Sequence, residues 1–270
     1  MKFIDKKNKR NAFVTNIVIN TFIKEQKKRG NECKYFLLCK TPYKNILRNF
    51  LIKEQQEKCC YCMRKLKYDD TTTLEHIIPK GANHTEVNGY LLTYKKIFTQ
   101  IKYESNLRKF AYPPYPHQIA YGNLCVSCKG ILKENSLSSL CCNCKREHST
   151  ITPLIFMPNI EHNIEYMKMS GEMILHIPDS NRTLDKLGLN NATLKEIRMF
   201  WALIAKNKSM KFIKQNRKYD LLSIVFHVNN LQDLAKNGYG NFAKYFSTNE
   251  YYWNLLKDYK WFYSYYKKKK

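Results

Sequence analysis

Three pairs of cysteines, each separated by two residues, constrain the fold of this chain more than any other feature. The pairs are Cys59 and Cys62, Cys125 and Cys128, and Cys141 and Cys144. A two-residue gap lets both thiolates of a pair reach one tetrahedral zinc ion. Buried free cysteines are the alternative, and three such pairs favour zinc. Because six candidates exceed four ligand positions, the spacing alone leaves the ligand set open.

An acidic residue and a histidine stand side by side between the first two cysteine pairs. Glu75 and His76 end the run Thr72 to His76, whose residues predict a β-strand. A carboxylate can hold a divalent cation that polarises a phosphodiester, and an imidazole with a reference pKa of about 6.5 can take a proton from the attacking water. A Glu-His dipeptide alone is weak evidence, since it can equally be surface decoration; the flanking cysteines strengthen the case.

The charge balance favours a polyanionic partner, most simply nucleic acid. Lys and Arg number 47 against 22 Asp and Glu, which gives a net charge of +25 over 270 residues. An AT-rich genome would explain abundant lysine but not the shortage of acids. Apolar residues make up 44% of the chain, so we expect a packed core rather than disorder.

The cysteines are expected to bind metal rather than to form disulfides. The start, Met1 to Lys7, lacks the apolar core of a signal peptide, and no stretch approaches the roughly 18 apolar residues that span a bilayer. We therefore expect a cytoplasmic protein with no membrane contact, where thiols stay reduced. No Gly-x-x-x-x-Gly-Lys motif occurs, so any use of ATP would need another chain.

Local patterns predict several elements. In the first half, we expect a helix over residues 11–28 and another that starts at Thr41-Pro42, with the run 35–38 extended between them. Residues 90–101 could form a helix inside a long insert, 81–122.

The second half is predicted to mix short extended runs with helices. Residues 155–158 are expected to be extended, and Ser170-Gly171 is expected to turn a hairpin. A helix follows, capped by Thr193 with Glu196 or by Asn191, and residues 216–270 are helical in pattern.

Four motifs together resemble the zinc-stapled HNH nucleases, which have a ββα-metal fold. They are Cys59-x-x-Cys62, Leu74 to Lys80, Asn123-Leu124 leading to Ser127-Cys128, and Cys142-Asn143-x-x-Arg146. Within that superfamily the chain is most similar to the Septu-type PtuB HNH subunits of bacterial anti-phage systems. The resemblance covers roughly residues 46–205.

The resemblance implies an α+β protein that cuts nucleic acid, either DNA or RNA. It implies a helical region over 1–58, a nuclease core with two inserts over 59–150, and a mostly helical region over 151–270. It also implies a structural Zn²⁺, a catalytic Mg²⁺ or Mn²⁺, and a PtuA-like ATPase of the same operon as partner.

The resemblance also implies roles for individual residues. His76 would be the general base, Glu75 the first metal ligand, and Asn123 the brace of the loop between the strands. Asn143 would be the second metal ligand, with His148 as its rival. The zinc ligands would be Cys59, Cys62, Cys128 and Cys142, while Cys125 competes with Cys128, and Cys141 and Cys144 compete with Cys142.

The alternative function is a zinc-dependent nucleic-acid-binding or interaction subunit without catalysis. It shares the basic charge and the cysteines, but it gives Glu75 and His76 no role.

Overall fold

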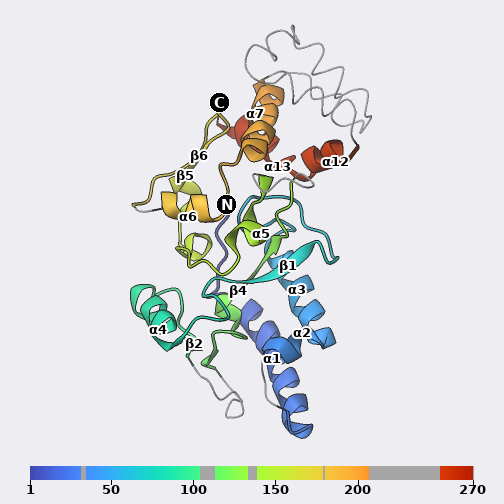
Figure 1. Cartoon of the computed structure of the whole chain (residues 1–270), viewed down its shortest axis with the longest axis vertical. Coiled ribbons are helices and arrows are strands. Elements are labelled where there is room, and N and C mark those ends of the chain that lie inside the picture. The colour runs from blue at the N-terminus through green and yellow to red at the C-terminus, as the bar shows by residue number, and fades with distance from the viewer. Residues whose placement is uncertain (32–34, 104–112, 133–138, 179, 207–249, 270) are drawn as a thin grey trace. The chain divides into compact units, whose positions relative to one another are not determined.

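The computed structural model describes residues 1–31, 35–103, 113–132, 139–178, 180–206 and 250–269 (Figure 1). They combine helices with small two-stranded sheets, so the predicted α+β class is confirmed. The chain divides into two compact units. Unit 1 comprises Met1–Ile131, Cys141–Asn163 and Ile177–Gly188, and unit 2 comprises Leu132–Leu140, Ile164–His176 and Leu189–Lys270.

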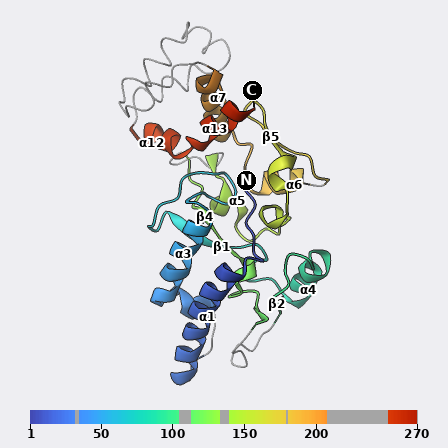
Figure 2. The same cartoon turned by 180° about the vertical axis from the view of Figure 1, so that it is seen from behind.

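Unit 1 opens with the two predicted helices, α1 (Lys9–Lys28) and α3 (Pro42–Glu54). The Asn8 side chain caps α1 by accepting a hydrogen bond from the Asn11 N–H at 3.1 Å. The helices pack against each other, as Figures 1 and 2 both show, and bury apolar side chains that include Phe22 and Leu47. The proline start of α3 is confirmed.

The prediction that residues 35–38 are extended is wrong, because they form helix α2 (Tyr35–Cys39). Leu38 is fully buried, and its carbonyl accepts hydrogen bonds from the Thr41 N–H at 3.1 Å and hydroxyl at 2.8 Å. Packing and this local capping outweigh the weak extended preference of the run.

The centre of unit 1 is a pair of antiparallel strands, separated in sequence by a long insert, followed by a short helix. Strand β1 (Thr72–His76), predicted from the sequence, pairs with β4 (Leu124–Cys128) so that Glu75 lies opposite Cys125. Helix α5 (Cys142–Arg146) packs against β4. Helix α3 packs against both strands. The side chain of Gln55, just after α3, accepts a hydrogen bond from the Val126 N–H and donates one to the Val126 carbonyl, each at 2.8 Å.

The insert between the strands carries helix α4 (His84–Thr93), short parallel strands β2 (Ile101–Lys102) and β3 (Tyr115–Pro116), and a 3₁₀ turn, η2 (Tyr121–Asn123). The helix lies earlier than predicted, because Asn83 and Glu86 form a capping box that starts it.

Unit 1 continues through 3₁₀ turns η4 (Leu154–Phe156) and η5 (Ile160–Asn163) to helix α6 (Asn181–Lys186). The extended prediction for 155–158 is wrong in its first half: the carbonyl of Pro153, a residue whose ring suits a turn, accepts a hydrogen bond from the Phe156 N–H at 2.9 Å.

Unit 2 contains the predicted hairpin, with strands β5 (Ile164–Tyr166) and β6 (Met173–Leu175). Its helices are α7 (Ala192–Lys206), α12 (Glu250–Asp258) and α13 (Trp261–Lys268). Asn191 caps α7, since its side chain accepts the Leu194 N–H at 2.8 Å, so the choice between the two candidate caps falls on Asn191. The helices predicted between 216 and 249 lie outside the described residues.

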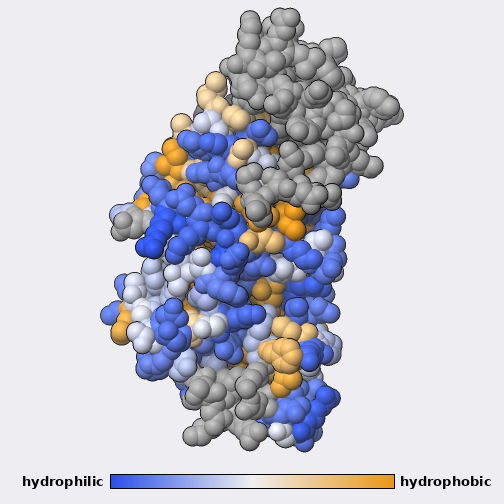
Figure 3. All heavy atoms as spheres, viewed as in Figure 1, coloured by the Kyte–Doolittle hydropathy of each residue, from blue (hydrophilic) through white to orange (hydrophobic). Residues whose placement is uncertain are grey.

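Two surface properties bear on function. Within the described ranges, no helix combines the length and apolar character needed to cross a bilayer. The face drawn in Figure 3 is mostly hydrophilic over the described residues, with scattered hydrophobic spots.

Candidate metal centre and active site

Four buried cysteines converge in unit 1. They are Cys59, Cys62, Cys128 and Cys142, and their sulfur atoms all lie within 4.8 Å of one another. The segment 59–62, which we call the knuckle, precedes β1 and supplies the first two cysteines. The third lies at the end of β4, and the fourth lies at the start of α5. These are the four positions that the resemblance implies.

The spacing of these thiols fits a tetrahedral metal such as zinc. The sulfurs of Cys59 and Cys142 are 3.7 Å apart, and those of Cys62 and Cys128 are 3.6 Å apart. Zinc–sulfur bonds of 2.3 Å at tetrahedral angles place sulfurs about 3.8 Å apart, whereas a disulfide bond is only about 2.05 Å long. Burial raises the pKa of the Cys59 thiol, but its interactions with the Cys128 and Cys142 thiols more than offset this rise, and the pKa falls to about 5.

The remaining cysteines of the motifs lie beside this cluster. Cys60 and Cys125 form a separate buried pair with sulfurs 3.7 Å apart. Cys141 is buried and its thiol interacts with Cys128 and Cys62, whereas Cys144 is half-buried. Cys141 and Cys144, the two alternatives to Cys142 as the last zinc ligand, are therefore not among the four cysteines that converge.

Gly130 shapes the loop that delivers the α5 cysteine. Its φ is +87°, a conformation that favours glycine, and an added Cβ would lie 1.6 Å from the carbonyl oxygen of Cys141. The Gly130 carbonyl accepts the Cys141 N–H at 2.8 Å, and the Lys129 carbonyl accepts the Cys144 N–H at 2.9 Å. The end of β4 and the start of α5 are thereby joined through the backbone.

Glu75 is buried at the end of β1 beside a cation. Its carboxylate lies 3.3 Å from the guanidinium of Arg146, and it accepts a hydrogen bond from the Thr73 hydroxyl at 3.4 Å. Burial raises the pKa of the Glu75 carboxyl to about 7, although Arg146 opposes that rise. A carboxyl so poorly solvated gains from any cation that comes near it.

His76 is held in one tautomer. Its Nε2 lies 2.8 Å from the carbonyl oxygen of Gln118, and because a carbonyl only accepts, Nε2 carries the proton and Nδ1 keeps its lone pair. Burial lowers the pKa of His76 to about 3, so the ring is neutral near pH 7. The Tyr35 and His76 rings pack edge to face, with their centroids 4.6 Å apart.

Asn123 ties together the loops around His76. Its side chain accepts the Ile78 N–H at 2.7 Å and donates to the Ile78 carbonyl at 2.9 Å and to the His117 carbonyl at 2.8 Å. His117 precedes Gln118, the residue that holds His76. Asn123 thus braces the segment after β1 and the segment that orients the imidazole.

Arg146 is a central residue for which the sequence suggested no role beyond membership of a motif. It is 2% exposed, and besides Glu75 it donates to the Tyr61 hydroxyl at 3.0 Å and to the carbonyls of His76 at 2.6 Å and Ile77 at 2.8 Å. It therefore links α5 to the end of β1. In a chain with 47 Lys and Arg, nothing marked this one as buried.

A cleft of about 490 Å³ brings the candidate residues together. Glu75 and His76 line it from β1, Asn143 lines it from α5, and His148 lines it from just beyond α5. Asn143 is half-buried and His148 is exposed. Five Lys and Arg residues line the cleft against three acids: Lys44, Arg48, Lys80, Lys129 and Arg146 against Asp70, Glu75 and Glu147. The cleft is therefore suited to an anionic ligand.

Comparisons of the chain with protein-family models, with curated proteins and with solved structures find no match. Its function is therefore inferred from the residues that line the cleft and from the cysteine cluster beside it.

Proposed function

We propose that this chain is a metal-dependent endonuclease of the HNH type, in which β1, β4 and α5 form a ββα-metal core. One observation carries the proposal: Glu75 and His76 at the end of β1 line the same cleft as Asn143 on α5. A carboxylate and an amide oxygen can hold a divalent metal, and a neutral imidazole can take the proton of a water that attacks a phosphodiester.

In this proposal the chain's own residues divide the work. His76 accepts the proton of the attacking water on Nδ1, because Nε2 is committed to Gln118. Glu75 and Asn143, with His148 as the rival of Asn143, would hold a Mg²⁺ or Mn²⁺ ion. Such an ion, when bound, polarises the scissile phosphate and stabilises the leaving oxygen.

The proposed structural Zn²⁺ would take no part in the reaction, because none of its four cysteines lines the cleft. Its four cysteines come from the knuckle, β4 and α5, so it would lock the helix that carries Asn143 against the strand pair that carries Glu75. Structural zinc sites of this kind contribute directly to folding.

One observation favours the alternative, a zinc-stabilised nucleic-acid-binding or interaction subunit without catalysis. Glu75 is already paired with Arg146 at 3.3 Å, and an ion pair of this kind can be purely structural. The basic cleft would serve either function, so the test must measure cleavage and binding separately.

The test incubates the purified chain with duplex DNA, single-stranded DNA and transfer RNA, each with Mg²⁺, with Mn²⁺ and with neither. We expect cleavage of at least one substrate that requires added metal. Binding without cleavage under every condition, with or without an ATPase partner, would support the alternative function. The ATPase partner and a role in antiviral defence are also proposals, supported by the motif resemblance.

Arg48 is expected to contribute a phosphate contact. It lines the cleft from α3, and its buried Nε has no hydrogen-bond partner among the described residues. Replacing it with glutamine should weaken nucleic-acid binding and lower the slope of log affinity against log salt by about one. Fluorescence anisotropy at several salt concentrations measures both quantities.

Lys53→Gln is the matched control for Arg48→Gln. Lys53 is an exposed cation on the same helix that does not line the cleft. An equal loss of affinity in the two variants would show that α3 acts only through its overall charge, and would remove Arg48 from the substrate site.

A further inference from the structure

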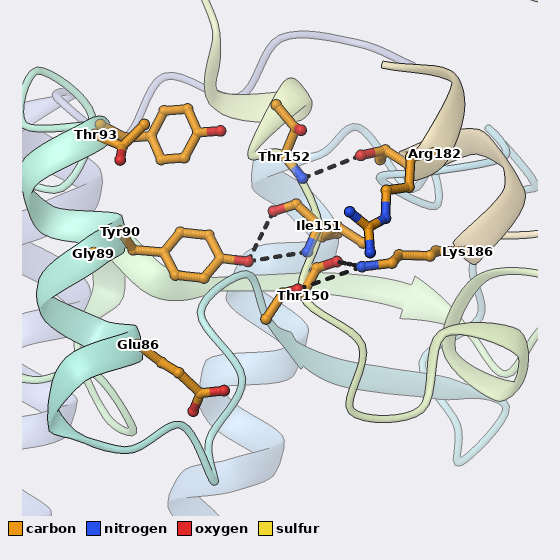
Figure 4. Close-up of a pocket in the computed structure, with 11 residues that line it drawn as sticks. Glu86, Gly89, Tyr90, Thr93, Thr150, Ile151, Thr152, Arg182 and Lys186 are labelled. Atoms are coloured by element: carbon orange, nitrogen blue, oxygen red, sulfur yellow. Dashed lines mark hydrogen bonds between the residues drawn. The ribbon is translucent and has the colours of Figure 1, made fainter. Parts of the chain in front are cut away.

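A second cleft in unit 1, of about 440 Å³, is not used by the proposed nuclease (Figure 4). One wall is helix α4, the opposite wall is helix α6, and residues 150–152 lie between them. Figure 4 shows Tyr90 pointing from α4 toward Ile151, while Arg182 and Lys186 reach in from the other side. Its volume lies within the range of about 300–1,000 Å³ typical of small-molecule sites.

The α6 wall presents two cations one helical turn apart. The Arg182 side chain has no hydrogen bond or ion pair among the described residues, so its donors are available to a ligand. The Lys186 ammonium is positioned by the Thr150 carbonyl at 2.6 Å and hydroxyl at 3.4 Å. Like charges at this spacing repel each other unless an anion lies between them. Glu86 is the one acid among the described residues that line the cleft.

The α4 wall is aromatic and fixed. The Tyr90 hydroxyl donates to the Ile151 carbonyl at 2.9 Å and accepts the Ile151 N–H at 3.0 Å. The Tyr94 ring lies 6.0 Å from Tyr90, and Phe98 lies 6.2 Å from Tyr90 and 6.3 Å from buried Phe156. Rings held in this way offer a preformed surface on which a base can stack.

Gly89 leaves room beside these rings. It lines the cleft, and an added Cβ would meet no atom within 4 Å. The cleft thus combines paired cations, an aromatic wall and free volume, which are the features that recognise a phosphate joined to a base.

We propose that the α4–α6 cleft binds a nucleotide, with its phosphate on Arg182 and Lys186 and its base against the Tyr90–Tyr94 wall. The phosphate has two sources, a free mononucleotide or one nucleotide of a nucleic-acid strand. The α4–α6 cleft shares no lining residue with the cleft that contains Glu75 and His76. The proposed nucleotide site therefore does not depend on whether the chain is a nuclease.

The test measures binding in the full-length His76→Ala chain, without added divalent metal, so that no substrate is cut. The probes are adenosine monophosphate and inorganic phosphate by calorimetry, and a short labelled oligothymidylate by anisotropy. Arg182→Gln should weaken nucleotide binding roughly tenfold, the usual worth of a charged hydrogen bond. Gly89→Glu, which places a carboxylate in the cleft, should weaken it at least as much.

Gly89→Ala is the matched control, because it changes the same backbone position without adding charge. Loss of adenosine monophosphate binding in Arg182→Gln and Gly89→Glu, but not in Gly89→Ala, supports a free-nucleotide site. Loss confined to the oligothymidylate supports a site for a nucleotide of the strand. If Arg182→Gln and Gly89→Glu, with zinc content and circular dichroism unchanged, bind all three probes as Gly89→Ala does, the proposal is overturned.

Discussion

Replacing His76 with alanine is expected to slow metal-dependent cleavage by roughly a hundredfold to ten-thousandfold, the usual contribution of a general base. The reason is that His76 is the neutral imidazole in the cleft whose Nδ1 keeps its lone pair, since Nε2 is hydrogen-bonded to Gln118. Single-turnover cleavage at saturating Mg²⁺ measures the loss. Nucleic-acid affinity and zinc content should stay unchanged, because the basic residues and the cysteines are untouched.

Two further variants distinguish loss of the general base from misfolding of the chain. His76→Gln nearly preserves the side-chain volume at a buried position but lacks the imidazole, so it should be as inactive as His76→Ala. His84→Ala removes an exposed histidine from α4 and should cleave at the wild-type rate. Wild-type cleavage by the His76 variants would exclude this residue as the base.

The second large effect is expected at the cysteine cluster. If the four cysteines hold zinc as proposed, Cys142→Ser should leave almost no zinc bound and should unfold unit 1. Structural zinc sites bind with an apparent free energy of about 10–16 kcal/mol, which exceeds the stability of most domains. Metal content by elemental analysis and thermal unfolding followed by circular dichroism measure the two effects.

Cys144→Ser is the matched control for Cys142→Ser. The two cysteines lie on the same short helix, but Cys144 is half-buried and its sulfur is not one of the four that converge. It should retain zinc and unfold near the wild-type temperature. If Cys144→Ser loses the metal while Cys142→Ser keeps it, the ligand set drawn from the geometry is incorrect.

The elements with a strong local signal could be predicted from the sequence. The strand-forming run before His76 becomes β1, and Thr41-Pro42 starts α3. The four cysteines chosen from ten also converge, but that choice depended on the motif resemblance, because the two-residue spacing pairs Cys144 with Cys141 and leaves Cys142 out.

The remaining features depend on tertiary contacts that no local pattern encodes. Helix α2 forms where Leu38 is buried and Thr41 caps it. Arg146 is buried where the Glu75 carboxylate and three backbone carbonyls accept its hydrogen bonds. The φ of Gly130 is required by the close approach of Cys141, a residue beyond an insert. In the sequence alone, nothing distinguishes Arg146 from the other arginines or Gly130 from the other glycines.

Glu75→Gln tests whether Glu75 holds a catalytic divalent metal, as the proposed function requires. Glutamine nearly preserves the volume of the buried Glu75 side chain, so the variant should fold and retain the proposed zinc. We expect the single-turnover cleavage rate in Mg²⁺ to fall at least a hundredfold, as when a group that stabilises the transition state is removed. Cleavage at the wild-type rate with the wild-type Mg²⁺ dependence would exclude Glu75 as a ligand of the catalytic metal.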